Sequence, residues 1–169
     1  MRALVVLLVA TVGFMAWAQW PSQKLHPSVH ADHIVVTKSQ RTLQLFSRGV
    51  LLKTYAISLG RHPEGAKTQQ GDGRTPEGAY QLDYHKSDSS FHRALHISYP
   101  SAQDRANAHA HGVDPGGLVM VHGIKKGLGW LGRAHRLVDW TDGCVAVTDA
   151  EIEEIYGAVS DGTPIEIRP

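Results

Sequence analysis

The chain has 169 residues, of which 42% are hydrophobic and 20% charged, which is enough for one globular domain with its own core. Beyond residue 18 it carries 16 basic and 16 acidic residues, because Arg2 is the only charged residue before that point, so the formal net charge there is zero. A nucleic-acid partner would require a basic excess, and this balance argues against one.

The first eighteen residues differ in composition from the rest. Arg2 precedes an uncharged, mostly apolar run from Ala3 to Met15, and small residues follow at Ala16 and Ala18. This pattern predicts a signal peptide over residues 1–18, because about thirteen apolar residues are too few to span a bilayer comfortably. An uncleaved amino-terminal membrane anchor is the alternative. In either case we expect an exported protein of the periplasm or cell-wall space.

Short β-strands dominate the next part of the chain. Residues 19–31 are predicted to be a linker, and residues 32–169 form the predicted folded domain. Three runs rich in β-branched and aromatic residues, separated by turn residues, predict an antiparallel meander over residues 33–37, 42–46 and 50–60. The density of glycine and proline then predicts a long surface loop over 61–79, which leads into a strand near 80–84.

The carboxyl-terminal half adds strands and one predicted helix. Further strands are predicted at 94–100 and 117–123, on either side of a polar segment, and the chain closes with a strand in TPIEIRP. Thr148 and Glu151 form a capping-box pattern, and three apolar residues follow at helical spacing: Ile152, Ile155 and Ala158. The sequence therefore predicts a mainly β domain with a short carboxyl-terminal helix.

Cys144 is the only cysteine of the chain. An exported protein with one cysteine cannot close an internal disulfide, so this thiol is an intermolecular link, a buried bystander or a functional group. It follows Gly143 at the start of an apolar run, in the stretch WTDGCVAV. Because glycine has no Cβ, another backbone or a substrate can approach there closely. This position is typical of a site.

His122 is the histidine most suited to act as a base for this thiol. It ends the apolar run VMVHG, and one loop joins it to the cysteine segment. A strand-end histidine and a strand-start cysteine on adjacent strands are expected to meet, although a buried core histidine shows the same pattern. If His122 activates Cys144, we expect the thiol to be alkylated faster at neutral pH than a free thiol.

With these two motifs the sequence resembles the L,D-transpeptidase catalytic domain, also called the YkuD-type domain. That family pairs a strand-end HG with a downstream [S/T]-x-G-C, here His122 and Gly123 with Thr141 to Cys144. The stretches GDGRTPEGAY, SYP and PGG occur in the expected order, so the likeness covers roughly residues 31–168. It implies a mainly β, sandwich-like catalytic domain with a short carboxyl-terminal helix.

The resemblance also implies a chemistry. Cys144 would attack a tetrapeptide donor of peptidoglycan, expel D-alanine and form a thioester that an amine acceptor resolves. His122 would move the protons, and Gly123 and Thr141 match the positions that orient it. Backbone amides around Gly143 and Cys144 would stabilise the oxyanion. No cofactor or metal is implied, and carbapenems are expected to acylate the thiol.

Two positions depart from the family pattern. Many members carry Arg or Asn where this chain has Ala146, and some carry a second His where it has Asp142. A carboxylate beside a thiolate disfavours ionisation unless it faces away or orients the histidine. Since the usual cation is missing, cations of the connecting loop are candidates to recognise a substrate carboxylate, namely Lys125, Lys126, Arg133 and Arg136, and the alternative is that they are solvated loop charges. Asp142 is also assigned to substrate binding.

Two alternative functions stay open. A hydrolase on the same fold would use water as acceptor and cut wall cross-links or release a wall-attached protein. Against it, segment 124–139 is long and rich in glycine, which predicts a mobile lid that covers the site and favours transfer. The other alternative is a periplasmic metal-binding module, in which five histidines would supply ligands: His85, His92, His96, His109 and His111.

Overall fold

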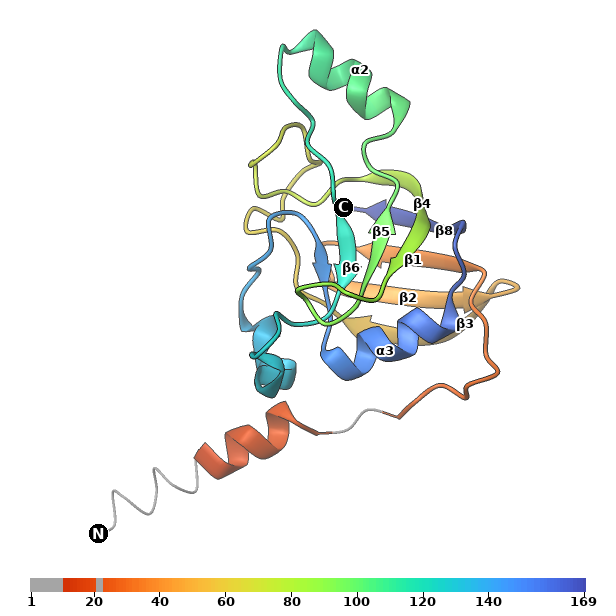
Figure 1. Cartoon of the computed structure of the whole chain (residues 1–169), viewed down its shortest axis with the longest axis vertical. Helices are drawn as coiled ribbons and strands as arrows, with labels where there is room; N and C mark the ends of the chain where they lie inside the picture. Colours follow the sequence, from red (N-terminus) through yellow and green to blue (C-terminus); the bar gives the residue numbers. More distant parts are fainter. Residues whose placement is uncertain (1–10, 21–22) are drawn as a thin grey trace.

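The computed structural model describes residues 11–20 and 23–169. Most of the predicted signal peptide and two residues of the predicted linker, 1–10 and 21–22, lie outside this description. Residues 11–18 are helical, and the described residues include no helix that is long and apolar enough to cross a membrane. The rest is one eight-stranded mixed sheet with helices at its margins (Figure 1).

The sheet begins with the predicted meander. Strands β1 (His33–Thr37), β2 (Thr42–Ser47) and β3 (Val50–Ala56) pair antiparallel, as expected from their sequences. Residues 61–77 contain no regular strand, in agreement with the predicted loop. The final strand β8 (Thr163–Arg168) then joins the two halves of the sheet, because it lies parallel to β1 and antiparallel to β4 (Gly78–Lys86).

The other edge of the sheet carries the two predicted motifs. Strand β5 (Ala94–Ile97) pairs antiparallel with β6 (Met120–His122), and β6 pairs parallel with the short β7 (Val145–Ala146). Isolated bridges connect Ser58 with Ala146 and Gly60 with Thr141. These bridges link the chain that follows β3 to the opposite edge, so the sheet curls around on itself and encloses the apolar core.

Helix α3 (Asp149–Ala158) is the predicted carboxyl-terminal helix. Thr148 caps its first turn through a reciprocal capping box with Glu151, as the sequence indicates. Ile152 and Ile155 are fully buried in the main hydrophobic cluster, so this helix lies across the sheet and closes the core (Figure 1). The mainly β domain with a carboxyl-terminal helix is thereby confirmed.

Two further helical elements were not predicted. Helix α2 (Ala102–Ala110) occupies the polar segment before β6, and its first turn has a capping box between Ser101 and Asp104. The sequence S-x-x-D was available as a signal, but the segment lacks the apolar periodicity of a buried helix. The 3₁₀ helix η1 (Gly129–Leu137) lies between the two motifs and is interrupted at Gly132.

Candidate active site

Strands β6 and β7 bring the two predicted catalytic residues together. Val121 pairs with Val145 and His122 pairs with Ala146 in parallel register, and Cys144 directly precedes β7. Paired residues of neighbouring strands point to the same face, and side chains alternate along each strand. Cys144 therefore points to the same face as Ala146 and His122. It is a diagonal cross-strand neighbour of the histidine, two residues before the residue that pairs with it.

The thiol of Cys144 is unpaired and only partly exposed. Its Sγ accepts the amide N–H of Met120 at 3.4 Å and lies 3.7 Å from the carbonyl oxygen of Leu118. Burial raises the pKa of the thiol to about 11, against the hydrogen bond from the Met120 amide, which lowers it; the charge of Asp142 raises it by a smaller amount, and that of Lys67 opposes Asp142. In the free protein at neutral pH this residue is a protonated thiol.

The ring of His122 is buried and has a defined orientation. Its Nδ1 lies 2.6 Å from the carbonyl oxygen of Gly123. A carbonyl oxygen only accepts, so the proton is on Nδ1 and the lone pair of Nε2 is free. Burial lowers the pKa of His122 to about 4, against the smaller opposite effect of the Gly123 carbonyl. The imidazole is therefore neutral at pH 7 and suited to accept a proton.

These pKa values oppose one expectation from the sequence. A thiol with a pKa of about 11 next to an imidazole with a pKa of about 4 is not a thiolate–imidazolium pair. Rapid alkylation of free Cys144 at neutral pH is therefore no longer expected. The physical reason is that both side chains lose water in the fold, which disfavours the charged form of each.

Thr141 and Gly143 shape the turn before the nucleophile. The Thr141 hydroxyl donates to the carbonyl oxygen of Cys144 at 2.8 Å and accepts the amide N–H of Gly143 at 3.1 Å. Gly143 has a φ of +123°, and a Cβ there would lie 2.5 Å from the carbonyl oxygen of Arg74. Only glycine fits this close approach of the two backbones. Thr141 thus orders the cysteine turn.

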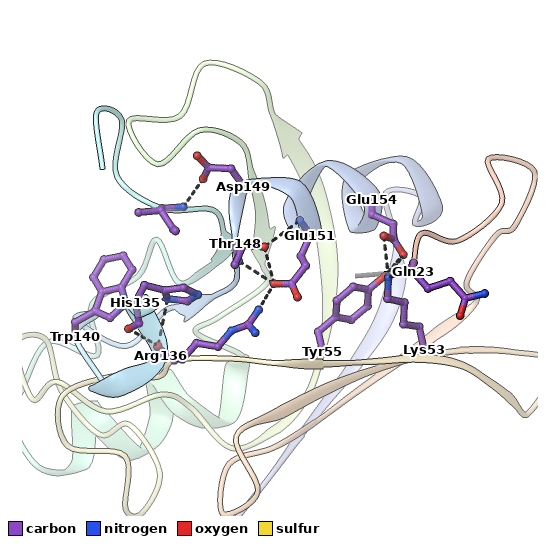
Figure 2. Close-up of polar contacts among 12 residues, drawn as sticks. Gln23, Lys53, Tyr55, His135, Arg136, Trp140, Thr148, Asp149, Glu151 and Glu154 are labelled. Atoms are coloured by element: carbon purple, nitrogen blue, oxygen red, sulfur yellow. Dashed lines mark hydrogen bonds and ion pairs between the residues drawn. The ribbon is translucent and has the colours of Figure 1, made fainter. Parts of the chain in front are cut away.

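Aromatic side chains enclose the histidine. The ring of Phe91 lies 4.5 Å from that of His122, and Trp140 stands edge-on to it at 5.7 Å. The Trp140 indole donates to Nδ1 of the buried His135 at 3.3 Å (Figure 2). No pattern in the sequence indicated Phe91 or His135, since each stands in a stretch without periodicity, whereas Trp140 borders the cysteine motif.

The predicted substrate-binding cations of the loop occupy different environments. Lys125 is exposed, and Arg133 is half-buried. The guanidinium of Arg136 donates to Glu151, which also accepts from the capping residue Thr148 (Figure 2). Arg136 thus ties η1 to the first turn of α3. A role of these residues in binding substrate stays a prediction.

Asp142, the acidic departure from the family pattern, faces solvent. Its carboxylate is paired with Arg61 at 3.0 Å, and both side chains are largely exposed. It raises the pKa of Cys144 through its charge, and among the described residues its ion-pair partner is Arg61 and not His122. The carboxylate therefore does not orient the base, and its assignment to substrate binding stays a prediction.

Ala146, the second departure, is completely buried. Its backbone exchanges two hydrogen bonds with Ser58, at 2.8 and 2.9 Å, and it is paired with His122 on the other side. A long cationic side chain has no space at this position. A different cation lies near the cysteine turn, because Lys67 Nζ would be 3.9 Å from a Cβ at Gly143, although it is already paired with Asp72 at 2.8 Å.

The histidines of the metal-binding alternative have separate partners. His85 bonds with Asp161, His92 with Glu153 and His96 with Asp83, while His109 and His111 lie at the end of α2. Within residues 11–20 and 23–169, no three His, Cys, Asp or Glu side chains are grouped so that they could hold a metal ion. The described part of the chain gives this alternative no support.

Comparison with known proteins agrees with this geometry. Residues 31–167 match the family profile described as the L,D-transpeptidase catalytic domain, YkuD. Over 142 residues the chain is 32% identical to YafK of Escherichia coli (strain K12), a protein provisionally named an L,D-transpeptidase. The match covers 78% of this chain and 50% of YafK, so the chain spans about half the length of the curated relatives it matches.

Solved structures share the fold at lower sequence identity. The helical cell shape determining protein Pgp2 of Campylobacter jejuni superposes with a TM-score of 0.61 at 19% identity, over 91% of this chain and 53% of its own. L,D-transpeptidase 3 of Mycobacterium tuberculosis, solved with a faropenem-derived adduct, gives 0.55 at 20% identity, over 82% and 60%. At these identities the likeness establishes the fold alone.

Proposed function

Since the chain belongs to the L,D-transpeptidase catalytic domain family, we propose that it is a cysteine-dependent L,D-transpeptidase acting on peptidoglycan stem peptides. One observation carries the proposal: Cys144 and His122 lie on the same face of adjacent parallel strands, with Nε2 of the histidine free. A nucleophile beside a correctly protonated base is the arrangement that acyl transfer requires.

The proposed reaction has two steps. Sγ of Cys144 attacks the carbonyl carbon at the L-centre of diaminopimelate in a tetrapeptide donor, and Nε2 of His122 takes the thiol proton. The tetrahedral intermediate collapses as the C–N bond breaks, and D-alanine leaves with that proton on its amine. A second amine then attacks the thioester, gives its proton to His122, and the departing sulfur recovers it.

The pKa values define when the proton moves. Because burial disfavours both charged forms, the thiol is not ionised before substrate arrives. Proton transfer from Cys144 to His122 therefore accompanies the attack on the carbonyl. A neutral histidine with a pKa of about 4 is already the basic form throughout the neutral range, so no pH change is needed to prepare it.

The cysteine turn supplies the candidates for stabilising the oxyanion. The Gly143 amide donates to Thr141 in the free protein, so it must exchange that partner before it serves substrate. The amide of Cys144 itself is the second candidate. Loss of one such donor typically reduces kcat by about 10²- to 10³-fold.

Hydrolysis is the second candidate function, and two observations favour it. The segment predicted to be a mobile lid is held in place, since Asp139 accepts from the Arg41 side chain and from the amide of Leu59, and Arg136 pairs with Glu151. The buried Ala146 also removes the cation that many relatives carry beside the nucleophile. A fixed loop and a missing cation both reduce the support for a covered site that holds an amine acceptor, and water then becomes the competing acceptor.

Purified muropeptides distinguish the two functions. We expect tetrapeptide donor plus an amine acceptor to give a new amide product by mass spectrometry, in excess of tripeptide. Tripeptide as the main product at saturating amounts of several different amines would assign the protein to the hydrolases. C144A should form neither product while it keeps the circular-dichroism spectrum of the native chain, and turnover by C144A would refute the thioester mechanism itself.

The site of action is also part of the proposal. We infer that the protein acts outside the cytoplasmic membrane, in the periplasm or cell-wall space, which the apolar amino-terminal run and the proposed peptidoglycan substrate both support. Mass spectrometry of the protein from its native membrane and periplasmic fractions would show whether the chain begins after Ala18. A full-length chain recovered from the cytosolic fraction alone would contradict export.

A further inference from the structure

The segment between the two catalytic motifs has an apolar outer surface. On and beside η1, four large hydrophobic side chains are strongly exposed: Leu128 at 41%, Trp130 at 56%, Leu137 at 68% and Val138 at 64%. We call these four residues the η1 surface. Large apolar side chains gathered on one exposed segment mark a surface that contacts a partner or a membrane.

An apolar hollow opens within this surface. It has a volume of about 340 Å³ and is lined mainly by Ile124, Leu128, Leu131, Ala134, Val138 and Trp140. Lys125 stands at its rim and His135 contributes the other polar group. Two residues of the η1 surface, Leu128 and Val138, therefore also line an apolar depression, which Lys125 borders with a cation.

The segment that carries the η1 surface is basic, although two carboxylates border it, those of Asp139 after Val138 and of Asp149 against Gly129. Residues 119–138 contain four basic residues and no acidic one. Arg136 is neutralised by Glu151, but Lys125, Lys126 and Arg133 have no ion-pair partner among the residues that the structure describes. Three cations without an ion-pair partner thus belong to the same segment as an apolar, tryptophan-bearing surface, and one of them, Lys125, lines its hollow. This composition is that of interfacial segments, which insert apolar and aromatic side chains between anionic headgroups.

The apolar amino-terminal segment ends at the same place. The helical residues 11–18 run toward η1 from outside the domain (Figure 1). A Cβ on Gly132 would lie 2.2 Å from the carbonyl oxygen of Ala18, and the Gln19 side chain donates to the carbonyl oxygen of Trp130. This helix exposes aromatic residues of its own at Phe14 and Trp17. The two apolar features are therefore neighbours.

From these observations we propose that the η1 surface is a membrane-docking face that binds an anionic lipid bilayer, with its apolar side chains at headgroup depth and its lysines on the phosphates. A second copy of the chain is a poorer occupant, because a symmetric contact would bring the same unpaired cations together. Docking by η1 would fix the orientation of the domain at the membrane, which a single amino-terminal attachment does not do. The proposal is independent of the reaction that Cys144 catalyses.

The single cysteine allows a direct test in the full chain. In the C144A background, a new cysteine at position 137 or at position 50 is labelled with an environment-sensitive fluorophore. Position 137 tests the η1 surface, and position 50, at the start of β3, is its matched control. The side chains of Leu137 and Val50 are exposed to a similar extent, 68% and 65%. The labelled F14C chain reports insertion of the amino-terminal segment separately. Vesicles contain phosphatidylglycerol with phosphatidylcholine, or phosphatidylcholine alone.

We expect the L137C probe to shift to the blue with anionic vesicles and the V50C probe to remain unchanged. Replacing Lys125 and Lys126 by alanine should weaken partitioning by about fivefold for each lysine. An unchanged L137C probe on vesicles that already shift the F14C probe would overturn the proposal, since the chain would then be attached by its amino terminus alone. A concentration-dependent L137C shift without vesicles would overturn it in favour of self-association.

Discussion

Trp140 stands edge-on to His122, with ring centroids 5.7 Å apart and an interplanar angle of 67°. The same indole donates its N–H to His135, a buried residue of η1 between the two motifs (Figure 2). The residue that keeps water from the proposed base is therefore itself held by a second histidine. Access of solvent to His122 depends on a side chain outside the HG and TDGC motifs.

Removal of Trp140 should change the pH dependence of the reaction. Burial is the main reason why the pKa of His122 is lowered to about 4, so W140A should raise it toward the ordinary value of 6.5. The neutral imidazole is the active form, so activity is lost as pH falls through this pKa. The acid limb of the kcat/KM profile should therefore move to higher pH, with activity at pH 7 reduced by about ten- to a hundredfold.

Trp130 provides the matched control for this experiment. It belongs to the same loop but is 56% exposed and has no ring contact with His122. W130A should leave the acid limb where it is in the native protein. An equal displacement in both variants would show that loosening of the whole loop, and not the cover over His122, sets the pKa.

The thiol should react slowly with small electrophiles when no substrate is bound. With a pKa of about 11 for Cys144, the thiolate fraction at pH 7 is about a hundredfold below that of a thiol with a pKa of 9. Iodoacetamide should accordingly alkylate Cys144 more slowly than it alkylates a model thiol at pH 7. The alkylation rate should keep rising with pH until the pH exceeds 10. Stopped-flow or mass-spectrometric rates across this range measure it, and a plateau below pH 8 would show a thiolate already formed.

β-Lactams of the carbapenem class should acylate the same residue, as the family resemblance implies. Such a compound engages the site as a substrate, so His122 can take the thiol proton during the attack. Intact-mass spectrometry should show one adduct, which C144A lacks. H122A should slow adduct formation more than it slows iodoacetamide alkylation, and equal slowing would argue against a proton-transfer role.

Two glycine substitutions should have opposite effects on stability. G143A places a Cβ 2.5 Å from the Arg74 carbonyl oxygen at a φ of +123°, and it should lower the free energy of unfolding by at least about 1 to 3 kcal/mol. Gly157 is in α3 with open space around it, so G157A should raise that free energy by about 0.5 to 1 kcal/mol. Urea unfolding measures both, and only G143A should reduce activity. Equal stabilities would show that the cysteine turn relaxes to admit a side chain.

Glu151 should contribute stability that depends on pH. Burial raises its pKa, but the charge of Arg136 and hydrogen bonds from Arg136 and Thr148 outweigh this, so the folded-state pKa is lowered. A lowered pKa means that the stabilisation is present above the unfolded pKa and is lost as pH falls through the folded value. E151Q leaves Arg136 without its counter-charge and should cost about 3 kcal/mol at pH 7.

The control for Glu151 is an exposed ion pair. Glu166 pairs with Arg168 on the surface of β8, where solvent screens the interaction, so E166Q should leave urea unfolding nearly unchanged. The difference between E151Q and the native protein should shrink at acid pH. A difference that stays constant from pH 7 to pH 3 would assign the loss to packing and not to charge.

Much of the fold was predictable because its signals are local. The alternation of β1 and β2, the glycine and proline of the loop after β3 and the capping box at Thr148 each depend on residues a few positions apart. Helix α2 was missed although Ser101 and Asp104 form such a box, because its residues are mostly polar and lack an apolar face. Local pattern detects a helix mainly through the face that it buries.

The sequence by itself supplied the residues of the proposed chemistry, namely the single thiol, a strand-end histidine and the glycine before the thiol, and the resemblance to the L,D-transpeptidase domain favoured a catalytic role over a buried thiol and a core histidine. The tertiary structure alone decided their state. Parallel pairing of β6 with β7 puts Cys144 and His122 on one face. Burial keeps both uncharged, with Phe91 and Trp140 packed against His122, and the carbonyl of Arg74 excludes any Cβ at Gly143. Protonation depends on lost solvent, and solvent is excluded by residues from distant parts of the chain, which no local pattern encodes.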